Sequence, residues 1–217
     1  MKATTHETIK REREEFLKRH KNKDHVFLIG ENSKVILSAP HGVSQVRNGK
    51  EKYQEPGTVS TTLHLQKICG CHAIFKTKNN NDDANYDEKS QYKEDLKKYI
   101  KENNIKYVLD IHSLSKDRKC DINLGTWHGK NVECDINLYR EFVKDLCDAG
   151  FNVYLDLPFG AGPRTVSGSM KDAFDKIWTI QIEINSKIAW YKSGFEKYKK
   201  LLDTLATFIV KIEGRNL

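Results

Sequence analysis

Short apolar runs alternate with amphipathic helical segments along this chain, and that alternation constrains its fold more than any other feature. Three of the runs have the length of buried strands, namely residues 34–37, 107–111 and 178–184. Between them, apolar residues recur at helical spacing over residues 58–68, 90–102 and 134–149. Alternating strands and helices are typical of layered α/β proteins. We therefore predict a three-layer α/β/α fold with a mixed, mostly parallel central sheet, formed by residues 1–217 as a single domain.

The first two strand-like runs lie close together in the chain. Residues 25–29 and 34–38 are joined by the segment Gly30-Glu31-Asn32-Ser33, whose residue types favour a tight reversal. This pattern predicts a hairpin-like pair. Residues 42–57 that follow are polar and are predicted to form a loop, after which Thr58 is expected to cap a helix.

Charge and cysteine content exclude several classes of protein. The net charge of +7 raises nucleic acid as a partner, but lysines alternate with acids, as in residues 10–15 and 94–98. Such alternation is typical of solvated helix faces, so dedicated nucleic-acid binding is disfavoured. Five cysteines without a Cys-x-x-Cys pair favour reduced thiols over a zinc finger or a disulfide framework.

Hydropathy along the chain indicates where the protein resides. No apolar run approaches the roughly 20 residues that span a bilayer. The start of the chain, residues 1–5, leads into a charged segment and lacks the apolar core of a signal peptide. We therefore expect a cytoplasmic protein without a membrane partner. Its oligomeric state cannot be read from the sequence, and a monomer is compatible with it.

Two histidines stand where apolar runs end. His41 follows residues 34–37 in the motif Ser38-Ala39-Pro40-His41-Gly42, and His112 ends the run at 107–111. Because ligand sites of open α/β sheets lie at the carboxyl ends of the strands, we expect these imidazoles to converge on one metal ion. The alternative is that each is a structural histidine held by hydrogen bonds.

A catalytic zinc site usually combines two histidines with a carboxylate and leaves one position for water. Glu55 fits best as the third ligand, since it lies in a loop fourteen residues after His41. The alternative is a solvated loop charge, because Glu55 follows a run of charged residues at 50–52. Asp110, two residues before His112 on the same side of a strand, could orient a metal-binding imidazole.

Glu183 lies inside the apolar run at 178–184. Ionised carboxylates are rarely buried without a partner, so this position calls for an explanation. Burial raises the pKa of a carboxyl group toward the range that a general base needs. A buried base beside metal-activated water predicts hydrolysis of an amide or ester carbonyl.

Four motifs are similar, in order and spacing, to those of the N-formylglutamate amidohydrolase family: Ser38-Ala39-Pro40-His41-Gly42, Asp110-Ile111-His112-Ser113, Asp121-Ile122-Asn123-Leu124-Gly125-Thr126 and Gln181-Ile182-Glu183-Ile184-Asn185. The resemblance runs from about residue 26 to 185. That family resembles the zinc carboxypeptidases in fold and site. The resemblance implies a metal held by His41, Glu55 and His112. It also implies a water nucleophile and a glutamate base, which falls on Glu183.

The family often has an Asp-x-Asn-Arg stretch that helps to hold substrate. Residues 83–86 read Asp-Ala-Asn-Tyr, so Asn85 is retained as a substrate-binding candidate and Tyr86 replaces the arginine. Arg118 or Arg164 could bind a substrate carboxylate instead, because a guanidinium suits two-point recognition. Alternatively, either arginine only pairs with a nearby aspartate.

The sequence thus predicts a metal-dependent amidohydrolase, with Zn²⁺ or another divalent metal as cofactor, that cleaves an N-acyl (N-formyl) amino acid or a similar small substrate. A metallocarboxypeptidase-like peptidase is the main rival, and an open groove would favour it. The rival from another class is a non-catalytic binding protein that has kept the fold. Loss of a ligand or of the base would be its mark, yet His41, Glu55, His112 and Glu183 are all competent residues.

Overall fold

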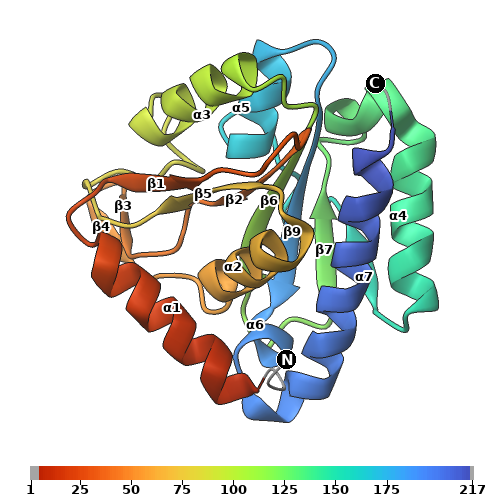
Figure 1. The fold of residues 1–217 in the computed structure, drawn as a ribbon, viewed down its shortest axis with the longest axis horizontal. Helices are drawn as coiled ribbons and strands as arrows, with labels where there is room; N and C mark the ends of the chain where they lie inside the picture. The colour runs from red at the N-terminus through yellow and green to blue at the C-terminus, as the bar shows by residue number, and fades with distance from the viewer. Residues whose placement is uncertain (1–4, 216–217) are drawn as a thin grey trace.

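The computed structural model describes residues 5–215, so residues 1–4, which enter the expectation about a signal peptide, lie outside it. Seven strands form one sheet in the order β1-β5-β2-β6-β9-β7-β8 (Figure 1). The central strands β5, β2, β6 and β9 are parallel, β1 and β7 run antiparallel to their inner neighbours, and β8 is parallel to β7. The mixed, mostly parallel sheet is therefore confirmed. The strands are β1 (His25–Leu28), β2 (Val35–Ala39), β5 (His72–Lys76), β6 (Tyr107–Leu114), β7 (Ile122–Gly125), β8 (Val153–Leu155) and β9 (Trp178–Asn185).

Helices cover both faces of this sheet, as a three-layer fold requires. On one face lie α1 (His6–His20), α2 (Thr58–Cys69), α4 (Ile136–Asp148) and α7 (Phe195–Glu213), and their apolar side chains form the larger core cluster. On the other face lie α3 (Gln91–Glu102) and α5 (Val166–Ala173), over a smaller cluster. Short elements complete the fold: α6 (Ser186–Ala189) and the 3₁₀ helices η1 (Lys130–Asp135) and η2 (Lys192–Gly194).

The sheet face beneath α3 and α5 changes from apolar to polar side chains along strand β6. In β6, Val108 packs into the smaller core, whereas Asp110 and His112 come next on the same face because side chains alternate. In β9, Gln181 and Glu183 follow Thr179 on that face, while Ile180 and Ile182 pack in the larger core. These polar positions lie toward the carboxyl ends of both strands, so polar side chains gather at that end of this face.

The predicted hairpin between residues 25–29 and 34–38 is wrong, because β5 lies between β1 and β2 in the sheet. Gly30 explains how the chain crosses the start of β5. A Cβ atom there would lie 2.4 Å from the carbonyl oxygen of Gly70. In addition, the Gly30 N–H donates to Nδ1 of His72 at 3.0 Å. Only glycine allows this close passage, and local turn propensity does not reveal it.

A hairpin does occur within the segment predicted as a polar loop. β3 (Gln45–Arg47) and β4 (Lys50–Lys52) pair as a separate two-stranded sheet. Asn48 and Gly49 join them with φ angles of 52° and 70°, as a tight hairpin turn requires. The Val46 N–H donates to the Asp82 carbonyl, which ties this hairpin to the loop after β5.

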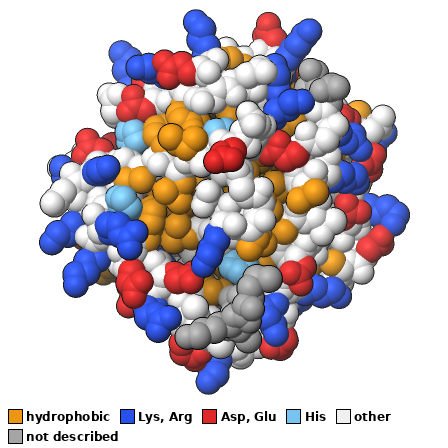
Figure 2. All heavy atoms as spheres, viewed as in Figure 1, with side chains coloured by type: hydrophobic (Ala, Val, Ile, Leu, Met, Phe, Trp, Pro, Cys, Tyr) orange, Lys and Arg blue, Asp and Glu red, His pale blue; other side chains and the backbone are white. Residues whose placement is uncertain are grey.

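The molecular surface carries mixed charge. On the face shown in Figure 2, lysine and arginine side chains are interspersed with aspartate and glutamate around the rim. Oppositely charged side chains also pair within single helices, such as Lys97 with Glu94 and Lys144 with Asp148. Among residues 5–215, no helix combines the length and the apolar character that crossing a membrane demands.

Candidate active site

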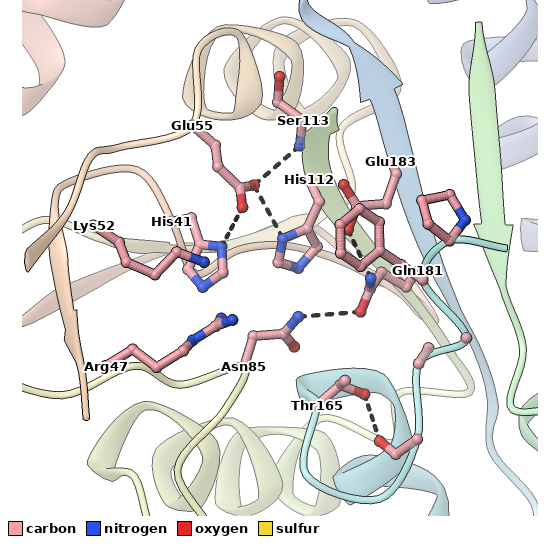
Figure 3. A pocket seen from close by; sticks show the side chains of 15 residues that line it. His41, Arg47, Lys52, Glu55, Asn85, His112, Ser113, Thr165, Gln181 and Glu183 are labelled. Carbon is pink, nitrogen blue, oxygen red and sulfur yellow. Dashed lines mark hydrogen bonds and ion pairs between the residues drawn. The ribbon is translucent and has the colours of Figure 1, made fainter. Parts of the chain in front are cut away.

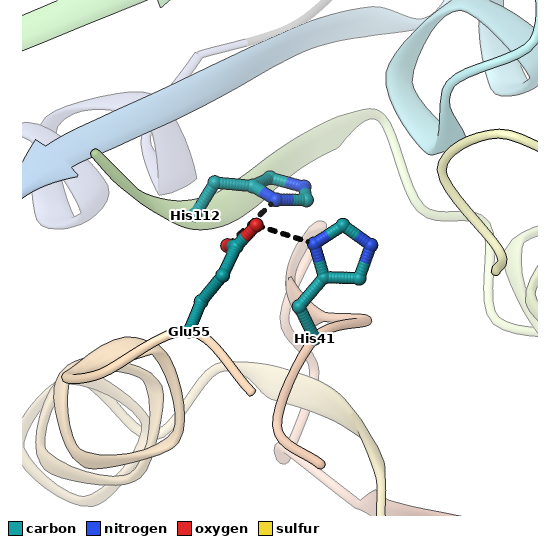
Figure 4. Close-up of side chains that lie close together, drawn as sticks. All are labelled: His41, Glu55 and His112. Carbon is teal, nitrogen blue, oxygen red and sulfur yellow. Dashed lines mark hydrogen bonds and ion pairs between the residues drawn. The ribbon is translucent and has the colours of Figure 1, made fainter. Parts of the chain in front are cut away.

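Three residues that are distant in sequence lie together at the carboxyl ends of the central strands β2 and β6. His41 follows β2, Glu55 lies in the loop before α2, and His112 is in β6 (Figure 4). Glu55 lies between the imidazoles, with Oε1 2.6 Å from Nδ1 of His41 and Oε2 3.1 Å from Nδ1 of His112. One ligand atom from each residue lies within 4.8 Å of the others, so the group could hold a metal ion.

The backbone holds Glu55 in this position. Its N–H donates to the carbonyl of His41 at 3.0 Å, and the Ser113 N–H donates to Oε2 at 3.0 Å. The expected cap at Thr58 is not found, because Gly57 is the N-cap residue of α2 and Thr58 begins the helix. The Thr58 hydroxyl instead donates to the carbonyl of Glu55. Each of these bonds fixes the loop that carries the carboxylate.

A second carboxylate binds the far side of each imidazole. Asp110 Oδ2 lies 3.0 Å from Nε2 of His112, as the two-residue spacing predicted. Asp83 Oδ1 lies 2.9 Å from Nε2 of His41, an arrangement that sequence reasoning missed. The position of Asp83 gave a signal, since it follows β5, whose carboxyl end is next to that of β2. Both carboxylates orient an imidazole so that its Nδ1 faces Glu55.

Charges in this cluster are mutually compensating. Burial opposes protonation of His41 and His112, but the neighbouring carboxylates outweigh it and raise the pKa of both imidazoles. Burial also opposes ionisation of Glu55, yet the two imidazoles hold the pKa of its carboxyl well below the ordinary value. The centre therefore favours an anion between two cations. A divalent ion can replace the two Nδ1 protons, because metal binding requires neutral imidazole and ionised carboxylate.

The donor set fits a divalent transition metal. Two imidazole nitrogens and one carboxylate form the usual protein ligands of an open zinc site. The other nitrogen of each imidazole is held by Asp83 or Asp110, as in carboxylate–histidine–metal arrangements. Ligands of this kind do not discriminate strongly among such metals.

Glu183 lies beside this group. It is the register partner of His112 in the parallel pair β6–β9, and it is buried. Burial raises the pKa of Glu183 to about 7, although the charge of His112 opposes the shift. Gln181 donates from Nε2 to Oε1 of Glu183 at 2.8 Å, and Asn85 donates to Oε1 of Gln181 at 3.1 Å. This chain of hydrogen bonds orients the carboxyl group.

A cavity of about 280 Å³ contains these side chains (Figure 3). Its lining includes His41, Glu55, His112, Glu183 and Asn85 among the predicted site residues. It also includes two cations that sequence reasoning missed, Arg47 and Lys52. Both belong to the β3–β4 hairpin, which the dipeptide Asn48-Gly49 could have revealed.

The two arginines predicted to bind substrate are not part of that lining. Arg118 lines a different cavity of about 420 Å³, together with Tyr154 and Leu157. The Arg164 guanidinium lies 5.9 Å from the ring centroid of Tyr86. Arg47 lies closer to the same ring, at 4.8 Å, and binds Asp83 through Nε and Nη2 at 2.8 and 2.7 Å. Of these arginines, Arg47 has the access to the cavity.

The fold is shared with carboxypeptidase-like and amidohydrolase α/β proteins. N-formylglutamate amidohydrolase from Ralstonia eutropha is 12% identical, with a TM-score of 0.57 over 88% of this chain and 97% of its own. A metallo-carboxypeptidase from Pseudomonas aeruginosa is 12% identical, with a TM-score of 0.56 over 93% of this chain and 68% of its own. A gene product from Agrobacterium tumefaciens is also 12% identical, with a TM-score of 0.60 over 90% and 98%.

These similarities are similarities of fold. No family model matches the chain, and no curated protein sequence does. The fold that the resemblance to N-formylglutamate amidohydrolases implied is confirmed.

Proposed function

We propose that this chain is a metal-dependent hydrolase that cleaves an amide bond of an N-acyl (N-formyl) amino acid or a similar small substrate. One observation carries the proposal: the buried carboxyl group of Glu183 shares a cavity with the His41–Glu55–His112 group. The similarity in fold to N-formylglutamate amidohydrolase supports the same class of reaction. The cavity volume of about 280 Å³ lies at the small end for ligand sites, which favours a small substrate over a polypeptide.

His41, Glu55 and His112 would hold the metal, and zinc suits this donor set. A divalent ion supplies Lewis acidity, which polarises a carbonyl group and acidifies water. Asp83 and Asp110 keep both imidazoles oriented for it through their Nε2 atoms.

Glu183 is the proposed general base. Its carboxylate takes a proton from the attacking water, and the resulting carboxylic acid returns that proton to the leaving nitrogen. In the metal-free site burial raises this pKa to about 7, which brings both forms of the carboxyl group within reach near neutral pH. Gln181 keeps Oε1 of Glu183 engaged, so Oε2 is the oxygen available for proton transfer.

The rivals make different demands on the cavity. A metallocarboxypeptidase-like peptidase needs room for a chain on the far side of the scissile bond, which the cavity volume disfavours. A non-catalytic binding protein has no need of a carboxyl group held beside the metal ligands. The placement of Glu183 thus argues against the binding protein, and the cavity volume argues against the peptidase.

Metal analysis combined with turnover tests the proposal. Purified wild type should bind about one equivalent of zinc. His112→Ala should bind much less, while His64→Ala, which replaces a histidine in α2, should match wild type. Glu183→Gln should keep its metal and lose at least about a hundredfold in amide hydrolysis. Equal metal in wild type and His112→Ala would remove His112 from the site, and unchanged turnover in Glu183→Gln would reject the base.

A further inference from the structure

The cavity has two chemically unlike sides. Arg47 and Lys52 line one side, and Arg47 binds Asp83, the partner of His41 at the end of β2. Residues 158–162 line the other side. They lie next to β7, because the Phe159 N–H donates to Oδ1 of Asn123, the register partner of Glu183. Since β2 and β7 are separated by β6 and β9, the candidate metal ligands and the base lie between the two sides.

The side next to β7 forms an apolar wall, defined here as residues 158–162 with the sequence Pro-Phe-Gly-Ala-Gly. Its lining side chains are those of Pro158, Phe159 and Ala161, and none of them is charged. Phe159 lines the cavity, and 41% of its surface is exposed. An exposed aromatic ring there offers apolar area to a ligand.

The apolar wall is held firmly against the sheet. Asn123 binds Phe159, and Asn131 donates from Nδ2 to the carbonyl of Ala161 at 3.0 Å. Gly125 allows close packing, since a Cβ atom there would lie 2.9 Å from both the Ala161 Cβ and the Phe159 carbonyl oxygen. A surface fixed by buried amide side chains is pre-organised for binding.

The opposite side offers positive charge. Arg47 is anchored by two of its nitrogens to Asp83, which fixes its guanidinium at the cavity. The side chain of Lys52 forms no ion pair or hydrogen bond within the described range 5–215. A carboxylate in the cavity would therefore gain one oriented and one unpaired cation.

We propose that the substrate is an N-acyl amino acid with an apolar acyl group larger than formyl. Its carboxylate faces Arg47 and Lys52, its scissile amide lies at the candidate metal ligands, and its acyl chain packs on Phe159. This inference rests on the proposed function and sharpens its substrate class. A formyl group would leave the apolar wall uncovered. A free dipeptide would place an ammonium group on the acyl side, where the lining is apolar.

A matched substrate series tests this assignment on the zinc-loaded protein. The substrates share glutamate as the amine and carry formyl, acetyl, butanoyl or 4-methylpentanoyl as the acyl group. We expect kcat/KM to rise along the series, by roughly fourfold for each methylene group that the wall buries. The dipeptide Leu-Glu, which differs from 4-methylpentanoyl-glutamate only by its α-ammonium group, should be at least tenfold poorer.

Phe159→Ala should lower kcat/KM at least tenfold for the 4-methylpentanoyl substrate and less than twofold for the formyl substrate. Leu155→Ala is the matched control, since Leu155 is an exposed apolar residue of β8 outside the cavity lining, and it should change neither. Phe159→Leu should retain most of the preference, which separates lost apolar contact from disturbed folding.

The outcomes separate this inference from the function on which it rests. Three results would overturn the acyl-group assignment but would leave an amide hydrolase. They are the highest kcat/KM for the formyl substrate, an equal loss of kcat/KM on all substrates in Phe159→Ala, and a higher kcat/KM for Leu-Glu than for 4-methylpentanoyl-glutamate. No turnover of any substrate by the zinc-loaded wild type would overturn the proposed function, and this inference with it.

Discussion

His112 and Glu183 are register partners on the adjacent parallel strands β6 and β9, so both side chains rise from the same face of the sheet. This pairing places a candidate metal ligand beside the proposed base without any loop in between. A slip of one residue in either strand would turn one side chain into the opposite core. The apolar residues Ile111 and Ile182, which pack in that core, therefore also fix the geometry of the candidate site.

The proposed base predicts how activity varies with pH. Only the carboxylate form of Glu183 accepts a proton, and burial raises its pKa to about 7. A bound divalent ion would lower that pKa, so we expect kcat/KM of the zinc-loaded enzyme to rise with pH and to level off at or below about pH 7. A pH–rate profile checks this, and a profile that is already flat from pH 5 would contradict the assignment.

Glu183 should also make folding stability depend on pH, and stability should fall as pH rises, whereas activity should rise. Its pKa is raised from 4.5 to about 7 on folding, so the folded state holds the proton more tightly. The stabilisation is full below about pH 4.5 and is lost as pH rises through 7. Between pH 5 and pH 8, metal-free wild type should lose roughly 2 to 3 kcal/mol relative to Glu183→Gln. Urea unfolding at both values measures the difference, and parallel behaviour of the two proteins would refute it.

The carboxylates behind the two imidazoles should control metal affinity. Asp83→Asn removes the charge that orients His41, and Asp110→Asn does the same for His112. Each change is expected to weaken zinc binding by about 10- to 100-fold, as outer carboxylates of metal sites usually do. Competition with a chelator measures the dissociation constants. Asp175→Asn, a change remote from the site, serves as the control, and wild-type affinity in both variants would show that neither carboxylate matters.

Lys93 should stabilise the segment that carries Asp83 and Asn85. It is buried, and its Nζ donates to the carbonyls of Asp87 and Arg164, which joins the loop after β5 to the residues before α5. Lys93→Met leaves both carbonyls without this donor, so we expect a loss of roughly 2 kcal/mol in the free energy of unfolding. Lys97→Met, on the same helix but more exposed, should cost under about 0.5 kcal/mol. Equal losses of the two variants in chemical denaturation would argue against a stabilising role for the two hydrogen bonds of Lys93.

The sequence alone determined which functional residues lie at or near the carboxyl ends of buried strands. Apolar runs that finish near a histidine, or contain a carboxylate, predicted that His41 follows a strand and that His112 and Glu183 lie within strands, because strand periodicity is local. The same periodicity predicted that Asp110 lies behind His112. The position of Glu55 could not be predicted from such a pattern, because hydrogen bonds to His41 and Ser113 hold its loop at the site.

The tertiary structure decided the order of the strands and therefore the neighbours. β5 entered between β1 and β2, which overturned the predicted hairpin and brought Asp83 to His41. Arg47 reached the same carboxylate from a hairpin of its own. Such contacts depend on which strands pair across long stretches of chain. That pairing requires close backbone passages like the one at Gly30, and the local periodicity of residues does not encode it.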